Sequence, residues 1–172
     1  LRSLMEQAPG MFDGIIEADE TYVGGIRRGT RGRGAKGKTP VVGVVKRGGS
    51  VYAKVATDCK ASTILPLIQK SIKPGSRLMT DKFPSYRKAR RHGYKHKTVD
   101  HGAREYVRGE VHTNTIEGFW SQLKRSIDGT YHAVSAKHLQ SYVNEFAWRY
   151  NLRNHETPLF PILLSRVGAL KR

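Results

Sequence analysis

Residues 112–125 read HTNTIEGFWSQLKR and predict an amphipathic helix with polar groups on one face. Glu117, Ser121 and Lys124 recur at helical spacing, four and then three residues apart. Asn114 lies one turn upstream and can line the same stripe. The apolar side chains fall on the other faces and can anchor the helix in a core: Ile116, Phe119, Trp120 and Leu123.

Two further acids stand upstream on strand-like runs. Asp19 lies in GIIEADET (residues 14–21), and Asp81 directly follows RLMT (residues 77–80). Along a strand Glu17 and Asp19 share one face, whereas Glu20 points to the other. Three separated acids that face one point are what a two-metal phosphodiester-cutting site needs. We therefore take Asp19, Asp81 and Glu117 as candidate metal ligands.

The order of the predicted elements indicates the fold class. A hairpin-containing mixed sheet covered by helices is an α/β fold. Acids on the first strand, at the end of the fourth and on the helix after the fifth give a ribonuclease H-like layout. One domain is expected over residues 13–153, between a remnant at 1–12 and a partly helical tail at 154–172. Strands are predicted at 14–23, 41–45, 50–57, 76–80 and 96–99. Helices are predicted at 61–72, at 84–92, around Glu117 and up to Ile127, and from Ser135 onward.

Composition points to a polyanionic partner. Lys and Arg number 31 against 14 Asp and Glu, which gives a formal charge of +17. Such an imbalance is typical of proteins that bind nucleic acid or anionic membranes. No run of about 18 apolar residues exists, so a membrane partner is not expected. Cys59 is the single cysteine and can build neither a disulfide framework nor a zinc knuckle; a reducing cytoplasmic setting fits this.

Each acid also has an ordinary structural interpretation. Asp19 could be a solvated strand residue or pair with neighbouring arginines, and Asp81 could cap the helix that begins at Pro84. Glu117 could form an ion pair with Lys124 or Arg125 on the helix surface. The acid after a buried run and the second acid at a strand end favour the catalytic interpretation.

The third catalytic residue is left open between two neighbours. Glu117 is the better direct Mg²⁺ ligand, because the ion prefers charged oxygens. Asn114 could position water or substrate, or could cap the helix. Lys124 could hold a DNA phosphate. His112 and His132 flank the helix and could approach the site.

Arginines and lysines outside this helix stripe are the candidate DNA-backbone contacts. Residues 24–38 form a glycine-rich basic loop that cannot bury much apolar surface. Its cations and three further arginines make up the predicted set: Arg27, Arg28, Arg31, Arg33, Lys36, Lys38, Arg125, Arg149 and Arg153.

Four motifs carry a resemblance to a known family. They are EADETYVGG (17–25), TDKFPSY (80–86), HTNTIEGFWSQLKR (112–125) and YHAVSAKHL (131–139). Together they resemble bacterial insertion-sequence transposases that have an acidic-triad integrase-like domain and are related to Merlin transposases. The similarity runs from about Phe12 to Arg153.

The resemblance implies a ribonuclease H-like core that cuts and joins transposon ends with two Mg²⁺ or Mn²⁺ ions. It makes Asp19 and Asp81 the first two acids and Lys124 the helix lysine, with Asn, His or Glu as the third residue. It also implies DNA ends and target DNA as partners, a homo-oligomer on that DNA and a nucleoid-associated location. Family members commonly carry an N-terminal zinc-ribbon-like region, so end recognition is expected upstream of residue 1 or in a partner.

Two other functions fit parts of the pattern. A decayed transposase would bind nucleic acid without metal-dependent nicking. A ribonuclease H-like nuclease would cut DNA or RNA without joining strands. Only a transposase yields joined DNA products.

Overall fold

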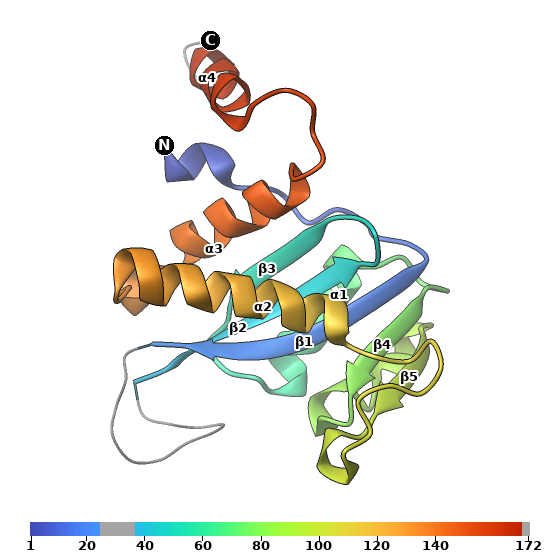
Figure 1. Cartoon of the computed structure of the whole chain (residues 1–172). Helices are drawn as coiled ribbons and strands as arrows, with labels where there is room; N and C mark the ends of the chain where they lie inside the picture. Colours follow the sequence, from blue (N-terminus) through green and yellow to red (C-terminus); the bar gives the residue numbers. More distant parts are fainter. Residues whose placement is uncertain (25–36, 170–172) are drawn as a thin grey trace.

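The computed structural model describes residues 1–24 and 37–169, which form a five-stranded mixed sheet flanked by helices (Figure 1). The strand order is β3-β2-β1-β4-β5. The first three strands pair antiparallel, and β4 and β5 continue the sheet in parallel with β1. The predicted mixed α/β class is confirmed. The strands are β1 (Ile15–Val23), β2 (Thr39–Lys46), β3 (Val51–Val55), β4 (Arg77–Asp81) and β5 (Lys95–Val99).

β1 is the central strand and is buried along most of its length. Its side chains alternate between the two sheet faces, as the strand period requires. Val23 packs into one apolar core, whereas Ile16 and Ala18 pack into the other. A strand buried on both faces leaves little room for charge, so the acids at 17, 19 and 20 need specific partners.

Helices cover both faces of the sheet, and each face has its own apolar core. α2 (Asn114–Ser126) and α3 (Ala136–Asn151) lie over one face in Figure 1, and α1 (Ala61–Ser71) lies behind the other. Leu123 and Val143 belong to the first core and are fully buried. Ile64 and Ile68 of α1 belong to the second and are also fully buried. The helical apolar spacing in the sequence therefore marks the faces that pack.

Both ends of the described chain pack together beside α3. The N-terminal 3₁₀ turn η1 (Arg2–Met5) and the last helix α4 (Leu159–Ala169) lie side by side in Figure 1. Met5, Trp148 and Leu163 are buried against one another. Within the described residues, no helix combines the length and apolar character that crossing a membrane would require.

The structure corrects two predicted helices. Residues 84–92 form two 3₁₀ turns, η2 (Pro84–Tyr86) and η3 (Ala89–His92), in place of one helix. Tyr86 and Ala89 are both fully buried, and a three-residue repeat places side chains at i and i+3 on one side. Helix α2 runs from Asn114 to Ser126, and the chain then continues past the predicted end at Ile127 as a π-helical turn, η5 (Ile127–Tyr131).

Candidate functional site

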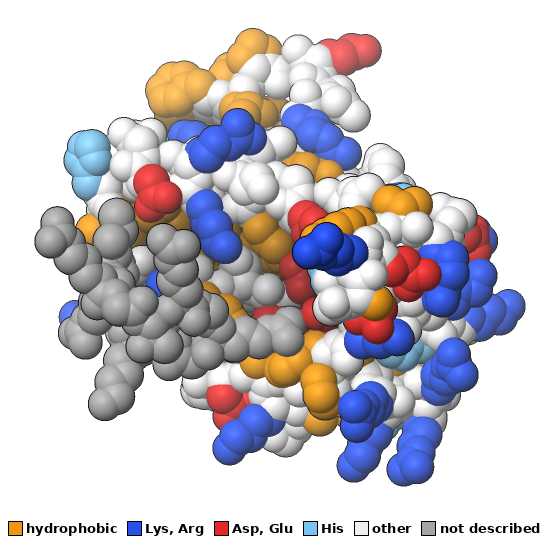
Figure 2. Space-filling model, turned by 60° about the horizontal axis from the view of Figure 1, so that its bottom comes forward, with side chains coloured by type: hydrophobic (Ala, Val, Ile, Leu, Met, Phe, Trp, Pro, Cys, Tyr) orange, Lys and Arg blue, Asp and Glu red, His pale blue; other side chains and the backbone are white. Residues whose placement is uncertain are grey.

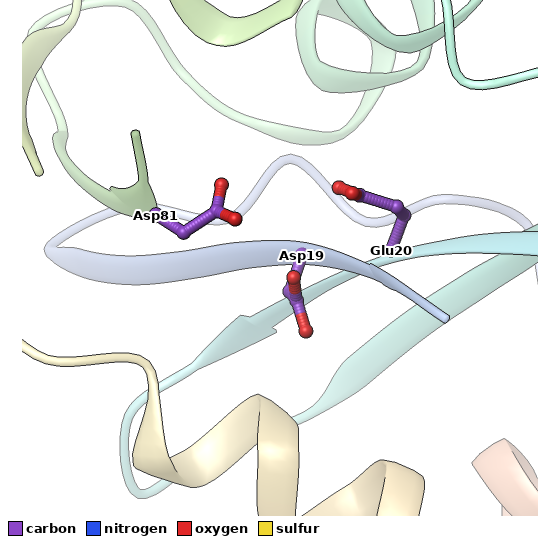
Figure 3. A group of neighbouring side chains, drawn as sticks. All are labelled: Asp19, Glu20 and Asp81. Carbon is purple, nitrogen blue, oxygen red and sulfur yellow. The ribbon is translucent and has the colours of Figure 1, made fainter. Parts of the chain in front are cut away.

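Three carboxylates from two neighbouring strands meet near the carboxyl end of β4. Asp19, Glu20 and Asp81 each offer one oxygen, and these oxygens lie within 4.8 Å of one another. In Figure 3, Glu20 and Asp81 extend toward each other on one side of β1, and Asp19 points to the side occupied by α2. Such a group of hard oxygens has the chemistry of a Mg²⁺ or Mn²⁺ site.

The strand register produces this convergence. β1 and β4 run parallel, with Glu17 opposite Met79. Two residues further along each strand, Asp19 and Asp81 are therefore level with each other. Asp81 ends its strand, and its Oδ1 accepts a hydrogen bond from the backbone N–H of Phe83 at 2.9 Å. The carboxylate thus also holds the turn that leads into the 3₁₀ turn η2, whose N-cap position is Phe83.

The surroundings of Asp19 favour its protonated form. Burial raises the pKa of Asp19 to about 8, and the negative charges of Glu20, Asp81 and Glu117 push it in the same direction. The amide N–H of Glu20 opposes them. A cation placed among these oxygens would reverse the balance, because it offsets the repulsion that ionisation creates. Perturbed acids of this kind are frequent at functional sites.

Trp120 holds Asp19 from the α2 side. Its indole Nε1 donates a hydrogen bond to Oδ2 of Asp19 at 3.1 Å. The indole fills the space above Gly43, the residue opposite Asp19 on β2. A Cβ on Gly43 would lie 2.6 Å from Cη2 of Trp120. The glycine therefore makes room for the ring that orients the carboxylate.

Glu17 anchors the N-terminus of α2 to β1. Its fully buried carboxylate accepts hydrogen bonds from the backbone N–H groups of Thr115 (2.8 Å) and Ile116 (3.0 Å) and from the Thr115 hydroxyl (2.9 Å). These are amides that a helix start leaves without an intrahelical partner. Arg47 Nε donates to the same carboxylate at 2.6 Å. We call these residues and His112 the Glu17 network.

The rest of the Glu17 network fixes the segment that enters α2. Arg47 also donates to the carbonyl oxygens of Glu110 (2.7 Å) and His112 (3.0 Å). Nδ1 of His112 lies 3.3 Å from Glu17 Oε1. Glu17 thus performs the capping that the sequence offered to Asn114, whose exposed side chain stands at the first helical position.

Glu117 and Lys124 of α2 both interact with Asp19 through their charges. Glu117 adds to the negative charge felt by Asp19. Its Oε1 accepts a hydrogen bond from the Thr113 hydroxyl at 2.6 Å and lies 3.6 Å from Nε2 of His101. Loss of hydration and the nearby Lys38 lower the pKa of the Lys124 amine, and Asp19 acts against them. Ser121, between the two on the predicted stripe, is exposed.

The predicted DNA-binding residues are spread over several surfaces. Lys38 and Arg125 are exposed, and Lys38 lies near Lys124. Arg149 pairs with Glu145 at 2.7 Å, and Arg153 donates to the carbonyl oxygen of Gly49 at 3.1 Å. The remaining predicted positions lie outside the described residues: Arg27, Arg28, Arg31, Arg33 and Lys36.

Two residues near the acids were not predicted. Glu20 joins Asp19 and Asp81 although strand alternation sends it to the other face, where its Oε2 accepts a hydrogen bond from Tyr86 at 3.1 Å. The adjacency of Asp19 and Glu20 in the sequence is the feature that could have predicted the presence of Glu20 in this group. His101 reaches Glu117 from a short 3₁₀ turn, η4 (His101–Ala103), in a stretch without a periodic pattern. Of the two predicted histidines, His112 belongs to the Glu17 network, and His132 is an exposed residue that follows η5, at the far end of α2.

Comparison with known proteins identifies a family and relatives that the chain resembles. Residues 11–151 match the family described as the ISXO2-like transposase domain. The chain is 29% identical to an uncharacterized transposase-like protein of Haemophilus influenzae over 101 residues, which cover 59% of this chain and 80% of that protein. It is 31% identical, over 87% of its own length, to an uncharacterized protein in transposable element ISH50 of Halobacterium salinarum, of which it spans 56%. No solved structure matches the chain.

Proposed function

The chain belongs to the ISXO2-like transposase family, and from this premise we propose that it cuts DNA at transposon ends and joins the freed strand to target DNA. The observation that carries the proposal is the meeting of Asp19, Glu20 and Asp81 oxygens within 4.8 Å. Burial and repulsion from the neighbouring acids raise the pKa of Asp19 to about 8. A bound cation would stabilise the ionised form of this carboxyl group.

Two Mg²⁺ or Mn²⁺ ions fit the residues present. Asp19 and Asp81 would hold them, with Glu117 as the third acid, and Glu20 is a further oxygen donor within reach of the first two. Bound ions at such a site lower the pKa of an attacking water or hydroxyl and stabilise charge on the leaving oxygen. Carboxylate oxygens alone supply this donor set, as Mg²⁺ prefers.

The protein's own groups position the reacting DNA. Trp120 orients the Asp19 carboxylate, and the Glu17 network fixes α2, which carries Glu117 and Lys124. Lys124 would hold a phosphate of the bound strand as a point charge. Asn114, exposed at the start of α2, would position water or substrate beside Glu117.

Finer assignments follow from the same proposal. We infer a ribonuclease H-like sheet, because three antiparallel strands are continued by two parallel ones and the acids stand on β1, β4 and α2. We also infer an acidic triad related to that of Merlin transposases, with residues 13–153 as the catalytic domain between segments 1–12 and 154–172. If the protein acts on two paired transposon ends, it would bind them as a homo-oligomer, and it would be located at the nucleoid.

The test is incubation with duplex DNA that carries the end of its own element, with and without Mg²⁺ or Mn²⁺. We expect metal-dependent nicks and joined strands. The Asp19→Asn variant should lose both products by at least roughly 1000-fold, since catalytic groups that act as a unit fail together. Asp13→Asn, the same chemical change in an exposed acid that pairs with Lys46, is the matched control and should keep full activity.

The outcomes separate the rival functions. Nicks without joined strands would make the protein a nuclease. DNA binding without nicks under either metal would leave a non-catalytic binding protein. Cleavage retained by Asp19→Asn would remove this carboxylate from the mechanism.

A further inference from the structure

The segment that follows Asp81 is the most one-sidedly charged part of the described chain. Residues 82–97 contain no Asp or Glu. They contain seven cations, which we call the basic strip: Lys82, Arg87, Lys88, Arg90, Arg91, Lys95 and Lys97. The whole chain has 31 cations to 14 acids, so the strip exceeds even this basic average.

All seven side chains of the basic strip are exposed. In Figure 2, Lys and Arg side chains gather on the side where β4 and β5 lie, next to acids near the centre of the face. Among the described residues, only two members of the strip form ion pairs: Lys82 with Asp100 at 2.7 Å and Lys97 with Glu110 at 2.9 Å. Five cations therefore lack an acidic partner within this part of the chain.

The backbone beneath these cations is firmly held. Tyr86 and Ala89 are fully buried, and the Tyr94 hydroxyl donates to the carbonyl oxygen of Ile72 at 3.1 Å. The Ser85 hydroxyl donates to the carbonyl oxygen of Cys59 at 2.6 Å. A charged surface on a fixed backbone loses less conformational freedom when it binds a ligand than a mobile loop does.

The basic strip contains a pocket of about 290 Å³, lined in part by Lys82, the residue that follows Asp81. Lys82, Arg87 and Arg90 line it together with Phe83, His96 and Thr98. Burial and the charge of Arg90 lower the pKa of His96 to about 4, so the positive charge comes from the three cations. Arginine and lysine together on one concave surface are typical of phosphate recognition.

We propose that the basic strip binds the phosphate backbone of DNA on the β4–β5 side of the carboxylates, with one phosphate in the pocket of Lys82, Arg87 and Arg90. The proposal rests on the proposed function, because DNA is the ligand that the carboxylates would cut. The strip begins at the residue after Asp81, so a strand bound there passes the acids. Contacts of this kind position DNA without reading its sequence.

The test uses the full chain, a labelled duplex of arbitrary sequence and EDTA, so that binding is measured without cleavage. The variant Arg87→Gln/Lys88→Gln/Arg91→Gln removes three exposed cations that lie outside the carboxylate site. We expect at least roughly tenfold weaker binding near 100 mM salt, and a salt dependence shallower by about 2–3 in log K against log salt.

The matched control is Lys54→Gln/Lys70→Gln/Lys137→Gln, which removes the same charge from exposed positions on β3, α1 and α3. It should keep nearly all of the affinity. Equal losses in both variants would show that net charge alone binds DNA and would overturn the proposal. So would unchanged binding by the strip variant, or by Arg87→Glu alone.

A separate assay keeps this result distinct from the proposed function. Wild-type cleavage in Mg²⁺ tests the carboxylates whatever the strip does. If the wild type nicks DNA while the strip variant binds normally, the strip assignment is wrong and the function stands. If the strip variant binds weakly and the wild type never nicks DNA, the binding surface stands without the catalytic role.

Discussion

Glu17 and Asp19 lie two residues apart on one face of β1, and their surroundings are opposite. The Glu17 carboxylate receives an arginine and three hydrogen bonds from the start of α2. Asp19 receives one indole N–H and faces two other acids. A buried acid with matched partners stabilises the fold. A buried acid among like charges destabilises it through electrostatic repulsion, which a bound cation can offset. The difference supports Glu17 as the anchor of α2 and Asp19 as the proposed metal ligand.

Neutralising Glu17 should give the largest loss of stability. Glu17→Gln leaves Arg47 without its carboxylate, and breaking a buried ion pair by removing one partner costs about 3–5 kcal/mol. Urea unfolding in EDTA measures the change. Glu110→Gln is the matched control, because Glu110 also pairs with two cations but lies 40% exposed and should cost no more than about 1 kcal/mol. Equal costs in the two variants would mean that the Glu17 network is no stronger than a surface pair.

Neutralising Asp19 should change stability in the opposite direction. Asp19→Asn removes a charge that burial and the neighbouring acids disfavour, so the metal-free protein should gain up to about 5 kcal/mol at pH 8, since the pKa is raised by roughly four units and one unit is worth about 1.4 kcal/mol. The same urea unfolding in EDTA checks the sign. Asp13→Asn should show no gain, because Asp13 has Lys46 as a partner. A loss of stability in Asp19→Asn would mean that the Asp19 carboxylate stabilises the fold, as the Glu17 carboxylate does.

The sequence predicts the strands and the acids on them better than it predicts their partners. Apolar runs and turn residues fix β1 to β5 within a few residues, and the alternation of β1 correctly separates Glu17 and Asp19 from Glu20. The parallel register that makes Asp19 level with Asp81 could not be predicted, because no local pattern records which strands pair.

Long-range hydrogen bonds explain what else was missed. The partner of Glu17 is Arg47, in a turn thirty residues away, and its other donors lie ninety-eight and ninety-nine residues away in α2. Residues 84–92 were predicted as one helix, since nothing local revealed that Tyr86 would be buried beside Glu20. The third catalytic residue, Glu117 or Asn114, stays a prediction, because it depends on a substrate and ions that side-chain spacing does not specify.

A change at Gly43 should disturb Asp19 without touching any charge. Gly43→Ala places a methyl group against the Trp120 ring, and overpacking a buried position costs about 1–3 kcal/mol. Because Trp120 donates to Asp19, cleavage should fall further than stability alone explains. Gly118→Ala on α2 is the control: its Cβ would meet nothing within 4 Å, and alanine favours a helix over glycine by about 1 kcal/mol. Cleavage unchanged in Gly43→Ala would show that Asp19 does not depend on the indole.

The smallest expected effect is a pH dependence that belongs to Asp19. The pKa of Asp19 is about 8 in the folded protein and 3.8 in the unfolded chain, so the folded state keeps this proton up to a higher pH. The free energy of unfolding in EDTA should therefore fall as pH rises toward 8, with a slope of up to about 1.4 kcal/mol per pH unit. His96 acts the other way below pH 6.5. The unfolded chain binds a proton on His96 near pH 6.5, whereas the folded protein binds it only near pH 4, so stability is lost as the pH falls.

The interval from pH 6.5 to 8 isolates the contribution of Asp19. Urea unfolding at both ends should show a loss of about 1–2 kcal/mol in the wild type and little change in Asp19→Asn. His96→Gln should change this loss by no more than about 0.4 kcal/mol, since folded His96 is neutral in this interval and unfolded His96 is at most half protonated. A wild-type curve as flat as that of Asp19→Asn would mean that Asp19 is already ionised and compensated without a cation. The contrast between the two acids of β1 would then disappear.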